Sequence, residues 1–564
     1  MLLDLPEQEV WQSIAIYLPP KDILSFLSVH RNIDKLSASP SFWNQLLLRD
    51  RDYEETSEDE STTTVAADAR QRFLLQSFMS TLSSVKWLPV SQDMQQRQFP
   101  VKAREGHNSC VLNGPDGFNS LVITGGFSDD QGVTVIMLEK GIKAHTSNWG
   151  WTRLSPRFSD EPTIVYGASL TSLPPALSED MEKDRFMRVS PGINKKNVAK
   201  AVRFGGFEGG GYSGESNEVW VLTIVDYDYE DDTLDQFAVW EKIETHGSSP
   251  RARAYHSATL IHDKYLVIIG GMTELGSCVE ESVLDTQTWT WIDIRLACKG
   301  GAPRGRHGHS VVWDKRRDRL VMFGGGSGTD LLRTGTDNNE VWELKTNGIP
   351  VPDSPGSVRS QSGSTKYETM WEWSKIRKNT LSRHNNSVRG DDDSDSDDSG
   401  VGSNDADINL SPSESLCLGR CHNAMKISPD AVLLMFGGGR PSTNGVVGYD
   451  LANDRFIRPN VKGPLPVARF TGAASFLETE GYILVHGGFN DATGGAVLDM
   501  NVLDLAPSLG RHFAGFALEE DRQSQESVTD EAARNGQYGA NPRQMSAFQR
   551  LLLAQLYEAH RSNL

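Results

Sequence analysis

Six glycine pairs recur along the chain, and each follows a short apolar run typical of a β-strand. The pairs are Gly125-Gly126, Gly205-Gly206, Gly270-Gly271, Gly324-Gly325, Gly437-Gly438 and Gly487-Gly488. Successive pairs are 80, 65, 54, 113 and 50 residues apart, and the shorter spacings are near the period of about 50 residues found in some repeat folds. Glycine permits a positive φ where a strand must turn. The sequence therefore predicts a repeat architecture built from small β-sheets.

Three further features recur with the glycine pairs. A polar turn with a histidine precedes each first strand, Asn-Glu-Val-Trp follows two of the pairs, and a tryptophan comes later in the unit. The histidines are His107, His256, His309 and His422; the Asn-Glu-Val-Trp stretches begin at Asn217 and Asn339; the tryptophans are Trp151, Trp240, Trp291 and Trp373. Segments with the pattern Pro-x-x-Arg connect the units, at Pro250–Arg253, Pro303–Arg306 and Pro466–Arg469.

In this combination, the region resembles the kelch family of β-propellers over about 420 residues. The resemblance implies a mainly β fold, a six-bladed propeller in which each tryptophan packs between neighbouring blades. Unit two begins with Val165 in place of the arginine, and unit six lacks the Asn-Glu-Val-Trp match. A closed ring removes exposed sheet edges.

The ring needs a last strand for its sixth unit. That unit ends near Asn501–Leu505 with no tryptophan strand after it, while Lys86-Trp87-Leu88 precedes the first histidine turn. We therefore expect residues 85–89 to supply the last strand of blade six and so to close the ring.

The first 50 residues differ from the rest, because they contain no glycine pair and have apolar residues at helical spacing. Breaks at Pro19-Pro20 and Ser39-Pro40 predict three short helices. This module resembles the F-box family. The resemblance implies that its apolar positions bind a Skp-type adaptor of a cullin–RING ubiquitin ligase, through Leu5, Pro6, Ile14, Leu18, Ile23, Leu24, Val29, Leu36 and Trp43. Where the family often has Cys-Lys after the valine, this chain has His30-Arg31.

Composition divides the chain into four parts. Residues 1–50 are the F-box-like module, 51–84 an acidic and then helical linker, 85–505 the propeller, and 506–564 a polar tail with a helix at about 545–560. Segments 172–197, 347–366 and 377–414 are polar insertions that cannot bury enough apolar area to order themselves.

The bulk composition limits the possible partners. The net charge of −19 argues against a large nucleic-acid surface and against anionic membranes, because both attract basic proteins. Five cysteines without a Cys-x-x-Cys pair fit a reducing compartment. No secretory signal or membrane-spanning run is evident. We expect a cytoplasmic or nuclear protein.

Together the two resemblances imply the substrate-recognition subunit of an SCF-type E3 ubiquitin ligase. Such a subunit is not itself an enzyme: it tethers a target protein near the conjugating enzyme and raises its effective concentration. The sequence contains no acid/base pair, nucleophile elbow or phosphate loop, and predicts no cofactor and no metal. The alternative is a non-catalytic kelch scaffold outside the ubiquitin system.

Arginines at the connections between units are the candidates for binding the target. They are Arg104, Arg253, Arg306, Arg420 and Arg469, of which Arg420 is displaced by one residue. A ring of guanidinium groups suits an acidic or phosphorylated peptide. The competing interpretation gives these arginines hydrogen bonds within loops or surface ion pairs.

Other features favour structural roles. Four histidines around a wide ring lie too far apart for zinc, so we expect them to form structural hydrogen bonds. Cys417 and Cys421 lack further ligands. The run Asp391–Asp398, with Ser394 and Ser396, suits an acidophilic kinase but is also typical of a solvated loop. The C-terminal helix would dock on the propeller or on a partner.

Overall fold

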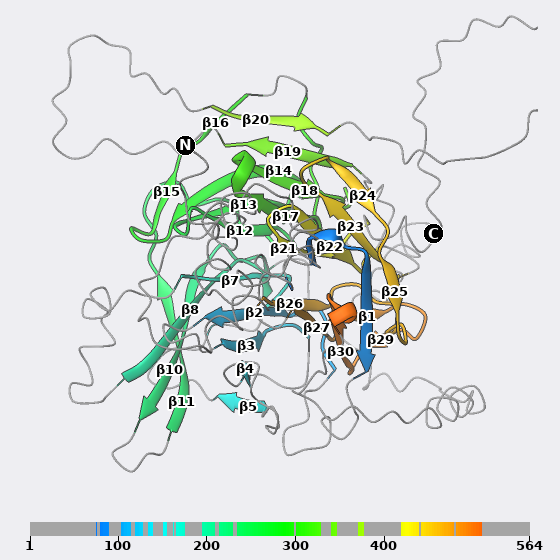
Figure 1. The fold of residues 1–564 in the computed structure, drawn as a ribbon. Coiled ribbons are helices and arrows are strands. Elements are labelled where there is room, and N and C mark those ends of the chain that lie inside the picture. Colours follow the sequence, from blue (N-terminus) through cyan, green and yellow to red (C-terminus); the bar gives the residue numbers. More distant parts are fainter. Residues whose placement is uncertain are drawn as a thin grey trace, which may run out of the picture.

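The computed structural model describes residues 75, 79–89, 103–113, 119–127, 133–138, 151–154, 162, 165–174, 195–208, 214–228, 234–297, 301–328, 340–346, 370–376, 419–438, 442–478 and 481–509. These residues are mainly strands, as the sequence predicts, and they include six sheets of four or five strands. Figure 1 shows these sheets grouped around a common centre. We number the sheets 1 to 6 in the order of their innermost strands.

Each of the first three sheets has four strands, named in order from the innermost outward. Sheet 1 contains β2 (Asn108–Asn113), β3 (Asn119–Thr124), β4 (Val133–Leu138) and β5 (Trp151–Leu154). Sheet 2 contains β7 (Ser169–Ser172), β8 (Lys195–Phe204), β10 (Val219–Asp228) and β11 (Leu234–Ile243). Sheet 3 contains β12 (Ser257–Ile261), β13 (Tyr265–Thr273), β14 (Gly276–Asp285) and β15 (Thr290–Ile292).

The remaining three sheets repeat this order, and two of them gain a fifth strand. Sheet 4 contains β17 (Ser310–Asp314), β18 (Arg319–Phe323), β19 (Val341–Lys345), β20 (Met370–Lys375) and β16 (Arg295–Ala297). Sheet 5 contains β21 (Asn423–Ser428), β22 (Ala431–Met435), β23 (Val446–Asp450) and β24 (Arg455–Ile457). Sheet 6 contains β26 (Ala473–Leu477), β27 (Tyr482–His486), β30 (Met500–Asp504), β1 (Ser84–Pro89) and β25 (Asn460–Lys462).

Smaller elements join the sheets. Two short pairs, β6 (Val165–Tyr166) with β9 (Phe207–Glu208) and β28 (Phe489–Asn490) with β29 (Gly495–Ala496), lie beside them, and the 3₁₀ turns are η2 (Lys315–Arg317) and η4 (Pro507–Leu509). Strand β8 corrects one prediction, because it begins at Lys195, inside the segment 172–197 that the sequence predicted to be an unordered insertion. Its register opposite β10 supplies the hydrogen bonds that composition alone did not reveal.

The innermost strands close into a ring. In chain order they are β2, β7, β12, β17, β21 and β26, and each contacts the strand before it and the strand after it, with β26 contacting β2. Because the last sheet contacts the first, the sheets form the closed arrangement of a β-propeller (Figure 1). Each innermost strand remains the edge of its own sheet, and the neighbouring sheets of the ring protect these short edges.

The N-terminal strand β1 lies within the last sheet, where the sequence predicts it. Trp87 is opposite Leu503 in the antiparallel pair with β30, and Val85 is opposite Val461 in the parallel pair with β25. Figure 1 shows β1, in blue, between the orange and yellow strands of sheet 6. The two ends of the described chain are thus hydrogen-bonded to each other.

The glycine pairs follow the second strand of each sheet, except in sheet 3, where Gly270 and Gly271 lie within β13 at a shift in its register with β14. Gly205 and Gly206, for example, have φ of 65° and 103°. Sheet 5 differs, because Phe436 takes the position of the first glycine with φ 59° and donates its amide to Gly445. In that sheet the strand therefore turns one residue earlier than the glycine pair suggests.

The tryptophans of the outer strands pack against the preceding sheet, as the resemblance implies. The ring of Trp291 lies 5.6 Å from that of Phe204 in sheet 2, and Trp373 donates its indole N–H to Glu281 of sheet 3. Trp240 joins a cluster with Leu112 of sheet 1. Each tryptophan buries a large apolar area between sheets, so these contacts stabilise the ring.

The segment before β1 packs on the propeller as well. Met79, Ser80 and Thr81 are helical, and Leu75, Met79 and Leu82 are buried in one cluster with Trp87. In the pair with β30, Lys86 is opposite Asp504 and Pro89 is opposite Asn501. Asp504 also pairs with Tyr482, the first residue of β27, so the chain enters β1 at the side where β26 turns into β27. We call this the hairpin side, and the opposite side, where the glycine pairs lie, the diglycine side.

Candidate functional site

A ring of main-chain hydrogen bonds surrounds the propeller axis on the diglycine side. It contains one residue from each connection before a first strand, and every one of the six has a positive φ. The amides donate in the order Gly106 to Thr471 (3.0 Å), Thr471 to Cys421 (3.3 Å), Cys421 to Gly308 (2.6 Å), Gly308 to Tyr255 (2.8 Å), Tyr255 to Gly167 (2.7 Å) and Gly167 to Gly106 (2.9 Å). This axial ring ties all six sheets together.

Apolar side chains pack around the axial ring. Tyr166, Phe207, Ala254, Met272, Phe470 and Phe489 form one buried cluster, contributed by β13, the short strands β6, β9 and β28, and two connections. The rings of Tyr166 and Phe207 have centroids 5.2 Å apart, and those of Phe470 and Phe489 are 5.6 Å apart. Main chain and buried side chains therefore occupy the middle of the diglycine side.

The repeated histidines form hydrogen bonds, and three of them join neighbouring sheets. His256 Nε2 is 2.9 Å from Ser169 Oγ, and His309 Nε2 is 3.1 Å from Ser257 Oγ. His107 pairs with His486 at 3.2 Å, and His422 Nδ1 lies 2.9 Å from the carbonyl of Gly419. Burial lowers the pKa of His256 to about 3 and that of His422 to about 4. The predicted hydrogen-bonded role is confirmed.

Metal binding gains no support from these residues. Within the described ranges, no group of three or more His, Cys, Asp or Glu side chains is arranged to hold a metal ion. Cys421 is described and half-buried, whereas Cys417 lies outside the described residues.

Three of the predicted target-binding arginines are fully buried. Arg253 donates to the carbonyls of Arg251 and Gly270 and to Glu280. Arg306 and Arg469 repeat this pattern, with Glu340 and Asp499 as the carboxylate partners. All three side chains have a relative exposure of 0%. We call this motif the arginine clamp, since one guanidinium joins a connection, a glycine pair and an acidic residue.

The other two predicted arginines are buried as well. Arg104 is 1% exposed, and its guanidinium lies 3.5 Å from the carbonyl of Gly125. Arg420 is 5% exposed and does not occupy the clamp position. Gly419 occupies the clamp position in this connection. Its carbonyl accepts a hydrogen bond from the amide of Gly325, just as the carbonyl of Arg306 accepts one from the amide of Gly271.

The assignment of these five arginines to the target surface is therefore corrected. A side chain without exposed surface does not contact a partner in this conformation, and its hydrogen bonds stabilise the loops instead. The competing interpretation of hydrogen bonds within loops describes the clamps better. Charged groups are rarely buried unless they are paired, which the carboxylates at Glu280, Glu340 and Asp499 provide.

Sequence reasoning missed the exposed arginines beside the clamps. Arg251 and Arg304 precede Arg253 and Arg306 by two residues and are exposed. Neither guanidinium has a hydrogen bond or ion pair to any residue that the structure describes. The repeated Pro-Arg-x-Arg pattern was the available signal, but it contains a buried and an exposed arginine that look alike in sequence.

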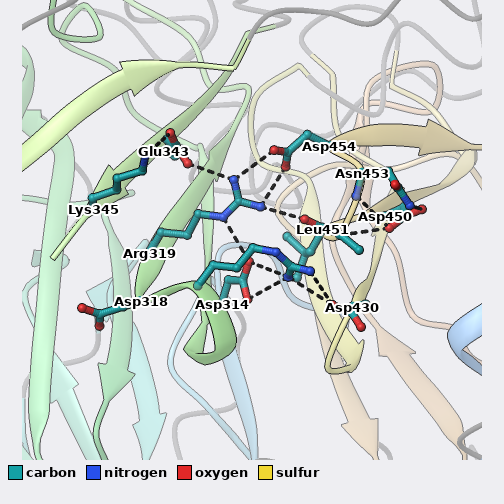
Figure 2. A network of polar contacts seen from close by, with 12 residues as sticks. Asp314, Asp318, Arg319, Glu343, Lys345, Asp430, Asp450, Leu451, Asn453 and Asp454 are labelled. Atoms are coloured by element: carbon teal, nitrogen blue, oxygen red, sulfur yellow. Dashed lines mark hydrogen bonds and ion pairs between the residues drawn. The ribbon is translucent and has the colours of Figure 1, made fainter. Parts of the chain in front are cut away.

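A second cluster of charge lies on the hairpin side, between sheets 4 and 5 (Figure 2). Arg319 donates to Asp314 and Glu343 within its own sheet and to Asp454 and the carbonyl of Leu451 in sheet 5. Burial works to raise the pKa of Glu343, but hydrogen bonds, first from Arg319, outweigh it and lower that pKa.

Arg317 extends the same cluster to Asp430 at 3.0 Å. The arginines of sheet 4 thus pair with carboxylates of both sheets. The cluster fastens sheets 4 and 5 to each other, and sheet 5 is the sheet in which Gly419 replaces the clamp arginine.

Several predicted features lie outside the described residues. They are the F-box-like positions Leu5, Pro6, Ile14, Leu18, Ile23, Leu24, Val29, Leu36 and Trp43, the acidic run Asp391–Asp398, and the C-terminal helix at about 545–560.

Comparison with known proteins identifies the class of the repeat region. Residues 194–364 match the family model of the KLHDC2/KLHL20/DRC7 Kelch-repeats domain. The described residues of this range lie within the closed ring of sheets, so the structure and the comparison both support a kelch-repeat domain there.

Curated relatives also match part of the chain. Adagio protein 3 of Arabidopsis thaliana is 26% identical over 344 residues, which is 59% of this chain and 46% of that protein. Acyl-CoA-binding domain-containing protein 4 of the same organism is 26% identical over 295 residues, 49% and 41% of the two chains. Kelch domain-containing protein 3 of Rattus norvegicus is 33% identical over 106 residues, 18% and 26%. The chain spans less than half the length of these relatives.

In the part of the chain that the structure describes, no helix has the length and hydropathy needed to cross a bilayer.

Proposed function

We propose that this protein is the substrate-recognition subunit of an SCF-type E3 ubiquitin ligase. In this proposal the F-box-like module binds a Skp-type adaptor, and a six-bladed kelch propeller binds the target protein. The six sheets and the six-membered axial ring support the number of blades. The subunit performs no catalysis itself, has no cofactor, and acts in the cytoplasm or nucleus.

One observation carries the proposal: the segment that follows the F-box-like module is part of the propeller. Leu75, Met79 and Leu82 are buried against sheets 5 and 6, and β1 lies between β30 and β25. In this proposal, the F-box-like module is attached to the propeller through this buried segment. Such an attachment suits a receptor, because ubiquitin transfer depends on the effective concentration of the target near the conjugating enzyme.

The direction of β1 distinguishes the two sides of the propeller. The chain enters from the hairpin side and leaves β1 on the diglycine side. The proposal therefore places the adaptor near the hairpin side and leaves the diglycine side for the target. The clamps hold the connections of that side in fixed conformations, which reduces the entropy lost when a partner binds.

Affinity capture from cells tests the proposal. The tagged chain should recover a Skp-type adaptor and a cullin, and the double substitution Leu5→Asp with Trp43→Ala should recover neither. Substituting the exposed Lys86 by alanine provides a control that leaves capture unchanged. If the wild-type chain captures other proteins but no adaptor, the alternative of a kelch scaffold outside the ubiquitin system replaces this proposal.

A further inference from the structure

The connections before sheets 3 and 4 carry exposed cations on a chain of strongly negative net charge. Arg251 and Arg304 occupy equivalent positions in these adjacent connections, each two residues before a buried clamp arginine. The formal charge of the whole chain is −19. Exposed guanidinium groups on the diglycine side, with no ion pair to the described residues, are therefore a local exception to the overall charge.

The main chain at both positions is held in place. The carbonyl of Arg251 accepts a hydrogen bond from Arg253 Nε at 2.9 Å, and that of Arg304 accepts one from Arg306 Nε at 3.1 Å. Asn217, just before β10, also donates to the carbonyl of Pro250 at 3.2 Å. Because the backbone is fixed, less conformational entropy is lost when these side chains bind a partner.

The carboxylates of the two clamps already form ion pairs with other residues. Glu280 binds Arg253, and Glu340 binds Arg306 and Lys375. The turn between β13 and β14 adds an exposed leucine, Leu275, with a relative exposure of 71%, and an exposed carboxylate, Glu274.

That turn lies beside the second arginine. A Cβ atom added at Gly305 would collide with the carbonyl of Ser277, so the start of β14 packs directly against the residue that follows Arg304. We define the arginine surface as Arg251 and Arg304 together with Glu274 and Leu275.

We propose that the arginine surface binds an acidic peptide segment of the target protein. Guanidinium groups form bidentate hydrogen bonds with carboxylates and with phosphates, and Leu275 offers contact to an apolar residue between the acidic ones. The inference rests on the proposed function in that it treats the bound protein as the target. Charge complementarity carries it: two exposed cations on a fixed backbone face solvent on the side opposite the adaptor.

Fluorescence anisotropy with the full-length chain tests this inference. The probes are a short labelled peptide of Asp, Leu and Ser, the same peptide with phosphoserines, and its neutral counterpart with Asn in place of Asp. We expect both acidic peptides to bind and the neutral one not to bind. Comparing the first two shows whether carboxylate or phosphate is the preferred group.

Substitutions assign the binding to the surface. Arg251→Glu and Arg304→Glu should each weaken binding by about tenfold, as expected for the loss of a charge-assisted hydrogen bond. Glu274→Gln should tighten it, because it removes the repulsion of an anionic peptide. Arg455→Glu, the same change at an exposed arginine paired with Asp450 on the hairpin side, should leave it unchanged.

Three results would overturn the inference. Neither acidic peptide binds better than the neutral one, or the arginine variants bind as tightly as wild type, or binding appears only after Asp391–Asp398 are replaced by asparagine. The last result would assign the surface to the chain's own acidic run. Adaptor capture by the Arg251→Glu variant is measured in parallel, so that failure of the target surface and failure of the ubiquitin-ligase proposal are separate outcomes.

Discussion

The indole of Trp87 packs against Phe436, with ring centroids 5.7 Å apart. The contact joins the first strand of the described chain to sheet 5, while the backbone of Trp87 pairs with Leu503 of sheet 6. A residue that precedes all the repeats in sequence thus completes the last sheet and seals it against its neighbour.

Trp87→Ala should destabilise the propeller strongly. The side chain is 1% exposed, and replacing a buried tryptophan by alanine typically costs about 3–5 kcal/mol. Urea denaturation followed by tryptophan fluorescence and circular dichroism measures the loss. Lys86→Ala, one residue earlier on the exposed face of β1, is the matched control. Equal midpoints for the two variants would contradict closure of the ring by β1.

Gly205→Ala should also lower the free energy of unfolding, by about 1–3 kcal/mol. The residue has φ 65°, and a Cβ atom there would lie 2.5 Å from the carbonyl of Arg253. Gly495→Ala provides the control, because a Cβ atom at that position meets nothing within 4 Å. Denaturation midpoints check the prediction, which fails if both alanines are tolerated equally.

Arg306→Ala should lower the free energy of unfolding much more than Arg304→Ala does. Removing the clamp leaves Glu340 and the carbonyl of Gly324 without their buried partner, and breaking a buried ion pair costs about 3 kcal/mol or more. Arg304→Ala removes only an exposed side chain and should change stability by less than about 0.5 kcal/mol. Chemical denaturation distinguishes them, and comparable stability losses would show that the clamp does not hold the connection in place.

Stability should depend on pH through Glu281. Burial raises the pKa of this carboxyl to about 7, although a hydrogen bond from Trp373 and other groups act in the opposite direction. Because the folded pKa is raised, the protonated group favours the folded state. Its contribution is present in full below the unfolded pKa near 4.5 and is lost as pH rises through about 7.

Glu281→Gln removes this titration and keeps an acceptor for Trp373. Between pH 5 and pH 8, wild type should therefore lose stability that the variant keeps. The free energy of unfolding of the variant should rise relative to that of wild type by up to about 3 kcal/mol over this range. Glu274→Gln, at an exposed carboxyl in the same sheet, is the control. Parallel stability curves for wild type and Glu281→Gln would refute the assignment.

The repeat signals in the sequence, together with the resemblance to kelch propellers, predicted the scaffold. Glycine pairs and outer tryptophans report local geometry that recurs from unit to unit, so their positions could be predicted from the repeat pattern. Sheet 5 departs from the repeat pattern, because Phe436 adopts a positive φ at the position where the pattern predicts glycine. In sheet 5 the turn begins one residue earlier than the glycine pair predicts, and Gly419 occupies the position of the clamp arginine.

The arginine surface could not be predicted in the same way. Arg251 and Arg253 share a repeated motif, and only the carboxylate of Glu280, contributed by a different strand, decides which of them is buried. Such a choice depends on contacts between strands rather than on spacing along the chain. The axial ring likewise consists of main-chain bonds, which side-chain patterns do not report.

Binding of the purified full-length chain to a purified Skp-type adaptor tests the central proposal most directly. Isothermal titration calorimetry should show a saturable complex for the wild-type chain, and the double variant Leu5→Asp with Trp43→Ala should show none while its propeller unfolds at the same urea midpoint. A folded wild-type chain that releases no binding heat with the adaptor at any temperature tested, and does not co-elute with it in gel filtration, would contradict the role of ubiquitin-ligase receptor.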